Sequence, residues 1–244
     1  MKEYNVGNTQ RLDRILSNSG YGTRKEVKKL IKQGMVKVDG ITVTDNGMHI
    51  DPTVASIDIN GEILSYREFI YIMMNKPAGV ISATFDNKNR TVVDLLSDEY
   101  KVFDLFPVGR LDIDTEGLIL LTNDGNLTHQ LLSPKKCVPK KYYAIVQGDV
   151  TEKDVEKFRS GVVLDDGYKT MPAELEIIND EEVELVIYEG KFHQVKRMFE
   201  SVGKKVKYLR RVAMGGVKLD KNLKNGNFRD LTEEEIRILK QYVK

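Results

Sequence analysis

The segment PVGRLDIDTEGLILLTNDG, residues 107–125, is the most informative stretch of this 244-residue chain. Its second part is an apolar run that follows Gly117 and ends at Asp124-Gly125, a pattern typical of a buried β-strand closed by a turn. Its first part combines Pro and Gly with two acids, Asp112 and Asp114, and therefore predicts a loop. The segment thus predicts two carboxylates held in a loop at the start of a rigid strand, a common setting for functional side chains.

Further strands are predicted on both sides of this segment, at 69–74, 141–148, 171–178, 183–188 and 205–213. Helical patterns are fewer and cover 151–159, 192–202 and 232–242. Strands outnumber helices, and turns such as Asn179-Asp180 favour antiparallel pairing. We therefore expect residues 68–244 to form an α+β domain with a mixed, mainly antiparallel sheet flanked by helices.

The N-terminal part has a different pattern. Apolar residues at helical spacing predict helices at 11–18 and 24–33, and Thr23 and Glu26 form the sequence signature of a capping box. The segment MVKVDGITV then predicts two short strands joined at Asp39-Gly40. Residues 1–62 are therefore expected to form a small basic domain with a modest core, joined to the larger one by a short link near 60–68.

Charge is unevenly distributed, although the formal net charge is only +1. Residues 10–40 carry eight Lys or Arg against three acids, and residues 191–218 carry nine against one acid. The segment 149–189 has thirteen acids and four bases. This segregation favours a basic face that binds a polyanion, although solvated surface charge would give the same pattern.

Composition argues against several classes of protein. One cysteine, Cys137, and three scattered histidines make neither an internal disulfide nor a zinc site. No apolar stretch approaches the ~20 residues that span a bilayer, and the N-terminus is polar. We therefore expect a soluble cytoplasmic protein without a metal and without a membrane partner.

Two families resemble the two halves of the chain. Residues 10–57, with RLDRIL, a break at Gly20 and TRKEVKKLIKQGMVKVDG, resemble an S4 (αL-like) RNA-binding domain. Residues 69–240 resemble the ribosomal small subunit pseudouridine synthase A family. The matching segments are NKPAGV (75–80), the segment 107–125, KKYYAIVQG (140–148) and EGKFHQVKRMFESVG (189–203).

This resemblance implies site-specific conversion of a uridine of small-subunit (16S) ribosomal RNA to pseudouridine, on the RNA or on an assembly intermediate. The reaction breaks the N1–C1′ bond, turns the uracil over and rejoins it through C5. It is an isomerisation, so no cofactor is expected. A monomer is the default expectation.

The resemblance assigns the catalytic carboxylate to Asp112, which would either attack C1′ or assist removal of the 2′ proton. The spacing of Asp112 and Asp114 alone would also suit a divalent metal or a two-carboxylate glycosidase, but neither a third ligand nor a fitting loop stands nearby. Asp114 is expected to brace the loop through Thr115 and the backbone.

Two further catalytic residues follow from the same resemblance. Tyr142 matches the family's tyrosine, which can stack on uracil or move a proton; Tyr143 follows it, and strand alternation allows only one of the two to face the cleft. Lys196 matches the basic partner of the acid, where many relatives have arginine, and Arg197 is the alternative.

The expected RNA contacts lie in both domains. Arg110 is expected to touch a phosphate or to fill the gap left by an extruded base. Lys76 would contact RNA or shape its own loop, and His193 is kept out of the catalytic set as a packed or capping group. The full expected RNA-binding set is Arg11, Arg14, Arg24, Lys25, Lys28, Lys29, Lys76, Arg110 and Arg197.

Three other functions compete with this interpretation. The first is modification of large-subunit rRNA by the same chemistry. The segment FHQVKRM favours the small-subunit branch of the family, but only weakly. The second is an inert RNA-binding assembly factor, which the intact GRLD segment, Tyr142 and Lys196 argue against. The third, a glycosidase of free nucleosides, would leave the S4-like module unexplained.

Overall fold

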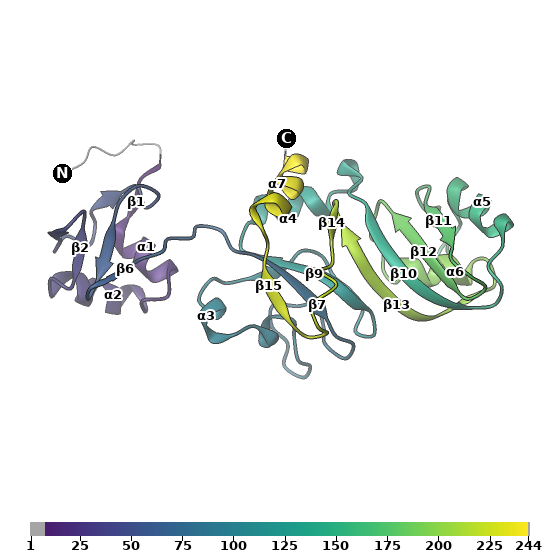
Figure 1. Ribbon diagram of the computed structural model, residues 1–244, viewed down its shortest axis with the longest axis horizontal. Helices are drawn as coiled ribbons and strands as arrows, with labels where there is room; N and C mark the ends of the chain where they lie inside the picture. Colours follow the sequence, from purple (N-terminus) through teal and green to yellow (C-terminus); the bar gives the residue numbers. More distant parts are fainter. Residues whose placement is uncertain (1–7, 244) are drawn as a thin grey trace. The chain divides into compact units, whose positions relative to one another are not determined.

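The computed structural model describes residues 8–243 (Figure 1). The described chain divides into two compact units, one ending at Phe69 and including Ser97–Asp104, the other formed by Ile70–Leu96 and the residues from Leu105 onward. The segment Ser97–Asp104, which contains helix α3 (Asp98–Lys101), was expected in the second domain. The sequence contains no pattern that would separate it from the strands on either side.

The first unit contains two helices and two small sheets. Helix α2 starts with the expected capping box, in which the Thr23 N–H donates to Glu26 Oε2 at 2.8 Å. The hairpin between β2 and β3 turns at Asp39 and Gly40, whose φ angles of 51° and 79° fit the turn type that this dipeptide favours. The elements are α1 (Leu12–Asn18), α2 (Arg24–Lys32), a sheet in the order β3 (Ile41–Thr42), β2 (Val36–Val38), β5 (Ile57–Ile59), β6 (Glu62–Ile63), and the pair β1 (Gln10–Arg11) and β4 (His49–Ile50).

The second unit is built on one large sheet. Its main path runs β11 (Glu174–Ile177), β12 (Glu182–Ile187), β10 (Lys140–Gln147), β13 (Lys205–Met214), β9 (Glu116–Thr122), β7 (Tyr71–Lys76) and β15 (Phe228–Asp230). β14 (Val217–Lys218) pairs with β13, and β8 (Phe106–Pro107) pairs with β9. Every pairing in this sheet is antiparallel except that of β9 with β13. The expected mixed, mainly antiparallel α+β fold is confirmed.

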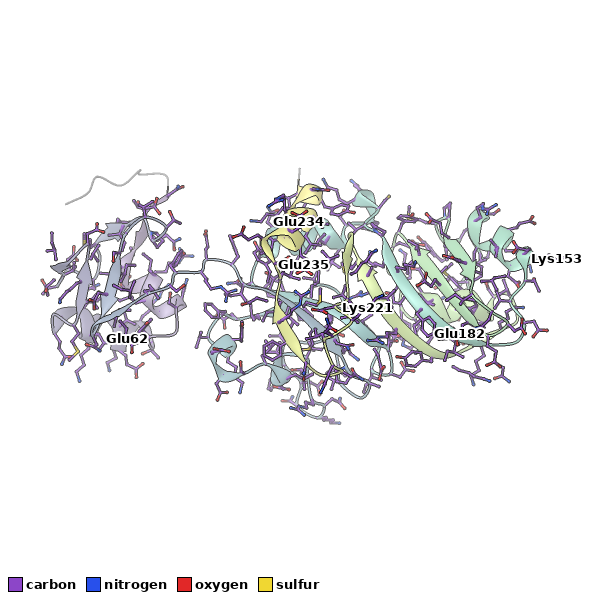
Figure 2. All side chains as sticks on the ribbon, viewed as in Figure 1. Glu62, Lys153, Glu182, Lys221, Glu234 and Glu235 are labelled. Atoms are coloured by element: carbon purple, nitrogen blue, oxygen red, sulfur yellow. The ribbon has the colours of Figure 1, made fainter. Side chains whose placement is uncertain are left out.

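Helices pack against both halves of this sheet (Figures 1 and 2). Helix α6 (Gln194–Glu200) packs on β13, and α5 (Glu152–Ser160) packs on β11, with Phe158 and Phe199 in ring contact at 5.0 Å. Helices α4 (Gly125–Leu132) and α7 (Glu233–Lys240) pack together over the other half. Short 3-10 turns lie at Val93–Leu95, Pro134–Lys136 and Gln241–Val243.

Helix α4 is the main element that the sequence pattern did not indicate. Asp124 was interpreted only as a turn residue, but its side chain is the N-cap of α4 and accepts the N–H of Leu127 at 2.9 Å. The second carboxylate oxygen accepts the hydroxyl of Tyr71 at 2.9 Å. Asp124 therefore ties the start of α4 to the neighbouring strand β7.

Gly117 allows strands β9 and β13 to approach each other closely in the middle of the sheet. It pairs with Lys76 of β7 on one side and with Arg211 of β13 on the other. Its φ of +100° is strained for any residue with a Cβ, and a Cβ at this position would lie 2.3 Å from the Arg211 carbonyl oxygen. The parallel contact between β9 and β13 therefore requires glycine here.

Gly117→Ala should destabilise the protein by about 2–5 kcal/mol, because it combines backbone strain with a backbone clash. Gly125→Ala is the matched control, since a Cβ there meets nothing within 4 Å, and should change stability by less than about 1 kcal/mol. Urea unfolding of both variants checks this, and equal midpoints would contradict the steric account.

Candidate active site

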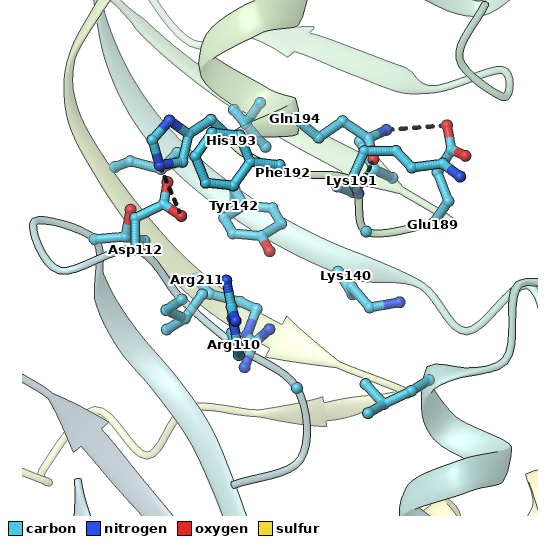
Figure 3. Close-up of a pocket in the computed structure, with 18 of the residues that line it drawn as sticks. Arg110, Asp112, Lys140, Tyr142, Glu189, Lys191, Phe192, His193, Gln194 and Arg211 are labelled. Atoms are coloured by element: carbon cyan, nitrogen blue, oxygen red, sulfur yellow. Dashed lines mark hydrogen bonds and ion pairs between the residues drawn. The ribbon is translucent and has the colours of Figure 1, made fainter. Parts of the chain in front are cut away.

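A pocket of about 390 Å³ opens beside the junction of β9 and β13 (Figure 3). Its walls come from five segments of the sequence. They are the loop 109–112 with Thr115, Leu132 and Pro134 at the end of α4, the face of β10 that carries Lys140 and Tyr142, Ile187 with the segment 189–195, and Leu209 and Arg211 of β13. The expected catalytic loop and tyrosine thus share one pocket.

Asp112 lies at the pocket wall in the turn that leads into β9. The turn is closed by the Thr115 N–H, which donates to the Asp112 carbonyl at 3.1 Å. One carboxylate oxygen of Asp112 is 3.5 Å from Lys196 Nζ, and the other is 3.6 Å from His193 Nε2. The side chain is 26% exposed, so the carboxylate is reachable from the pocket while two basic groups surround it.

Lys196 contacts both acids of the loop. Its ammonium lies 2.6 and 2.8 Å from the two carboxylate oxygens of Asp114, closer than it lies to Asp112. This hydrogen bond is the main cause that lowers the pKa of Asp114. The expected brace of Asp114 through Thr115 is not formed, since the Thr115 hydroxyl has no hydrogen-bond partner within residues 8–243; Asp114 instead positions the lysine that stands beside Asp112.

Arg197 points away from the catalytic acid. Its guanidinium lies 2.6 Å from Asp165 and 2.7 Å from Asp166, and the side chain is only 13% exposed. The alternative assignment of Arg197 as the partner of Asp112 is therefore wrong, because consecutive residues of a helix point in different directions. Its ion pairs and low exposure also argue against the expected RNA contact.

Tyr142 faces the pocket, as expected. Strand alternation places it on the inner face of β10, where it is 7% exposed. Tyr143 lies on the opposite face, in edge-to-face contact with Tyr208 at 6.2 Å between ring centroids. The arrangement leaves Tyr142 as the aromatic ring of β10 that can stack on a base in the pocket.

Lys76 shapes the acidic loop from inside the protein. It is fully buried, and its ammonium donates to the carbonyls of Thr115 at 2.8 Å, Pro77 at 3.0 Å and Ile113 at 3.4 Å. Burial lowers its pKa to about 8, against the raising effect of nearby acids such as Asp114. The expectation that Lys76 contacts RNA is wrong, since RNA cannot reach a side chain without exposed surface.

Lys76→Met should therefore lower turnover at least about tenfold by loosening the loop, while RNA affinity and its salt dependence change little. Methionine keeps the length of the side chain but cannot donate to the loop carbonyls. Single-turnover rates and filter binding over a range of salt concentrations check this. A weakened affinity with a reduced salt slope and an unchanged rate would restore the RNA-contact interpretation.

The remaining expected RNA-binding residues are exposed. Arg110 lies at the pocket rim, and the six residues of the first unit, Arg11, Arg14, Arg24, Lys25, Lys28 and Lys29, all reach solvent. Arg11 also makes a two-pronged pair with the buried Asp13, at 3.0 and 2.9 Å. These placements are compatible with phosphate contacts, which remain a prediction.

Several pocket residues were missed by the sequence interpretation. His193 was kept out of the catalytic set as a packed or capping group; it is the N-cap residue of α6, but its side chain makes no cap hydrogen bond, and a left-handed φ of 49° turns its ring toward Asp112. Phe192 stacks on it at 3.8 Å and is 67% exposed. Lys140 and Arg211 are buried, and only the inward parity of their strands could have indicated this.

Two negative findings concern residues 8–243 alone. Within them, no group of three or more His, Cys, Asp or Glu side chains could hold a metal ion. No helix of this part of the chain is long and apolar enough to cross a membrane.

Comparisons with known proteins identify the family of both units. Residues 70–201 match the family described as RNA pseudouridylate synthase, and residues 10–54 match the S4 domain. An uncharacterized RNA pseudouridine synthase of Bacillus subtilis is 51% identical over 95% of this chain and 98% of its own length. The ribosomal small subunit pseudouridine synthase A of Vibrio cholerae is 42% identical over 93% of this chain and 97% of its own.

Other relatives extend the comparison. The ribosomal large subunit pseudouridine synthase B of B. subtilis is 36% identical over 95% of this chain and 96% of its own length. A crystal structure of a pseudouridylate synthase superposes with a TM-score of 0.67 at 36% identity, covering 94% of this chain and 99% of the other. The chain therefore belongs to the RNA pseudouridylate synthase family and combines an S4 domain with the catalytic domain of those enzymes.

Proposed function

We propose that this enzyme isomerises a specific uridine of 16S ribosomal RNA to pseudouridine, with Asp112 as the catalytic carboxylate. The observation that carries the proposal is the pocket in which Asp112 lies between Lys196, at 3.5 Å, and His193, at 3.6 Å, beside the ring of Tyr142. Relatives named ribosomal small subunit pseudouridine synthase A are 37–43% identical to this chain, against 36% for the large-subunit relative, which favours the 16S assignment by a narrow margin.

The charges around Asp112 suit either route of the reaction. Lys196 places a positive charge 3.5 Å from the Asp112 carboxylate, where it can orient that group for attack on C1′ or for removal of the 2′ proton. Tyr142 offers a ring on which the target uracil can stack once it has left the RNA helix. Asp114 keeps Lys196 in place through its closer contact.

RNA binding would use surfaces in both units. The exposed Lys and Arg of α1 and α2 would contact phosphates without reading sequence. At the pocket rim, Arg110 and the exposed ring of Phe192 would hold the nucleotides beside the extruded uridine. In this proposal the protein acts as a cytoplasmic monomer on rRNA or on a small-subunit assembly intermediate.

A second candidate is modification of large-subunit rRNA, which the relative named ribosomal large subunit pseudouridine synthase B supports. Its 36% identity extends over both units, so the domain arrangement does not separate the two substrates. An inert assembly factor is less well supported, because Asp112 and Tyr142 share one pocket and Lys196 lies 3.5 Å from the Asp112 carboxylate.

Pseudouridine mapping separates these possibilities. The 16S and 23S rRNA of cells lacking the enzyme would be incubated with purified protein, both as naked RNA and as assembly particles. We expect one new pseudouridine in 16S rRNA. A new site confined to 23S rRNA would establish the large-subunit function instead, and no new site on any RNA would favour the assembly factor.

A further inference from the structure

Two buried cations lie in the pocket beside the tyrosine. Arg211 is 2% exposed and Lys140 is 7% exposed, yet both line the pocket (Figure 3). Arg211 is the partner of Tyr142 in the pairing of β10 with β13, and Lys140 precedes Tyr142 by two residues on the same face. In Figure 3, Asp112 and Lys140 lie on opposite sides of the Tyr142 ring.

Arg211 has donor capacity that the described residues do not use. Its Nε donates to the carbonyl of Leu118 at 2.7 Å, whereas its buried Nη2 has no hydrogen-bond partner within residues 8–243. A buried guanidinium nitrogen without an acceptor is costly, because it has lost water and gained nothing in return. Its position in the pocket wall indicates a ligand with an acceptor atom.

Lys140 is likewise a buried cation that a ligand could neutralise. Its ammonium donates to the carbonyl of Val138 at 3.1 Å, and within residues 8–243 it forms no ion pair with a carboxylate. Glu189 exerts an attraction from across the pocket, but its oxygens already accept from Tyr168, Met171 and Gln194. Burial, and then the charge of Arg211, lower the pKa of Lys140 to about 8.

The proposed reaction creates a negative group in this pocket. When N1–C1′ breaks, its electron pair leaves with the uracil, whose negative charge spreads over N1, O2 and O4. C1′ then bonds to an Asp112 oxygen, or the sugar becomes a glycal after Asp112 has taken the 2′ proton. In the first route C5 of the anion then displaces the Asp112 oxygen from C1′, and in the second C5 bonds to C1′ while Asp112 returns the proton to C2′. The C5 proton is then lost and N1 gains one, so the product is an isomer.

Resting on the proposed function, we infer that Arg211 and Lys140 bind the detached uracil as its anion and retain it while it turns from N1 to C5. The geometry gives each part of the pocket one task. Asp112 acts on the sugar, Tyr142 carries the ring by stacking, and the two buried cations neutralise the charge of the leaving base. Retention of the free base is required, because a uracil lost to solvent would leave an abasic site.

The test uses the whole protein and two free bases of similar size. 5-Nitrouracil is an anion at about pH 7, whereas thymine is neutral. We expect calorimetric titration to show at least about tenfold tighter binding of 5-nitrouracil, as two charge-assisted hydrogen bonds would give. Lys140→Met and Arg211→Met should each reduce this preference to about threefold or less, while Lys153→Met on α5 should leave it unchanged.

The pH dependence gives a second readout. Raising pH from about 7 to 9 should weaken 5-nitrouracil binding to the unmodified protein, because Lys140 loses its proton near pH 8. The other charged or titratable groups acting on it are Arg211, Glu189 and Cys137. Lys140→Met should abolish this dependence. Because Arg211 also supports β9, Lys140→Met is the decisive variant where Arg211→Met does not fold.

Failure would be distinct from failure of the proposed function, since no RNA is involved. The inference is overturned if 5-nitrouracil does not bind saturably, if thymine binds equally well, or if the preference survives in Lys140→Met. Titration with inorganic phosphate tests whether the two cations bind the phosphates of the RNA backbone instead. Phosphate that binds in place of 5-nitrouracil, and requires Lys140, would assign the cations to the RNA backbone and contradict the inference.

Discussion

The parallel contact between β9 and β13 is the constraint on which the rest of the catalytic unit depends. The large sheet joins two antiparallel halves at this point, and Gly117 makes the approach possible by lacking a Cβ that would lie 2.3 Å from the Arg211 carbonyl. The same contact sets the position of the loop that carries Asp112, because that loop ends where β9 begins. It also places Arg211 in the wall of the pocket, directly beside Tyr142 in the pairing with β10. A single backbone approach thus brings the acid, the ring and a buried cation to one place.

Two lysines then fix the acidic loop, one through its backbone carbonyls and the other through its carboxylates. Lys76 is buried beneath it and donates to its backbone carbonyls, so the loop conformation is held without using the carboxylates. Lys196 contacts the side chains of Asp114 at 2.6 Å and Asp112 at 3.5 Å. The closer acid holds the ammonium, and the more distant one is left able to react with a substrate. This division explains why two carboxylates two residues apart need not act as a pair.

Much of the fold followed from local patterns, because strands and capped helices are specified by neighbouring residues. The Thr23 capping box is an example of a prediction that the structure confirms. Helix α4 was missed because Asp124-Gly125 is equally a turn signal, and only the contact with Tyr71 across the sheet distinguishes an N-cap. The burial of Arg211 is indicated only by the inward parity of its strand, whereas the basic composition of its segment favoured a surface that faces a polyanion. Whether such a side chain is buried depends on contacts with residues distant in the sequence, and its sequence neighbours do not determine it.

The central claim is that Asp112 is the carboxylate that reacts and that Asp114 only positions its neighbour. Single-turnover conversion of the rRNA substrate by Asp112→Asn and Asp114→Asn, with RNA affinity measured in parallel, tests it most directly. Both substitutions remove one charge from the same loop, so each controls for the effect of the other on folding and binding. The account predicts no pseudouridine with Asp112→Asn at an affinity within about threefold of the unmodified enzyme, and a reduced but measurable rate with Asp114→Asn. Product formation by Asp112→Asn together with an inactive Asp114→Asn would contradict it.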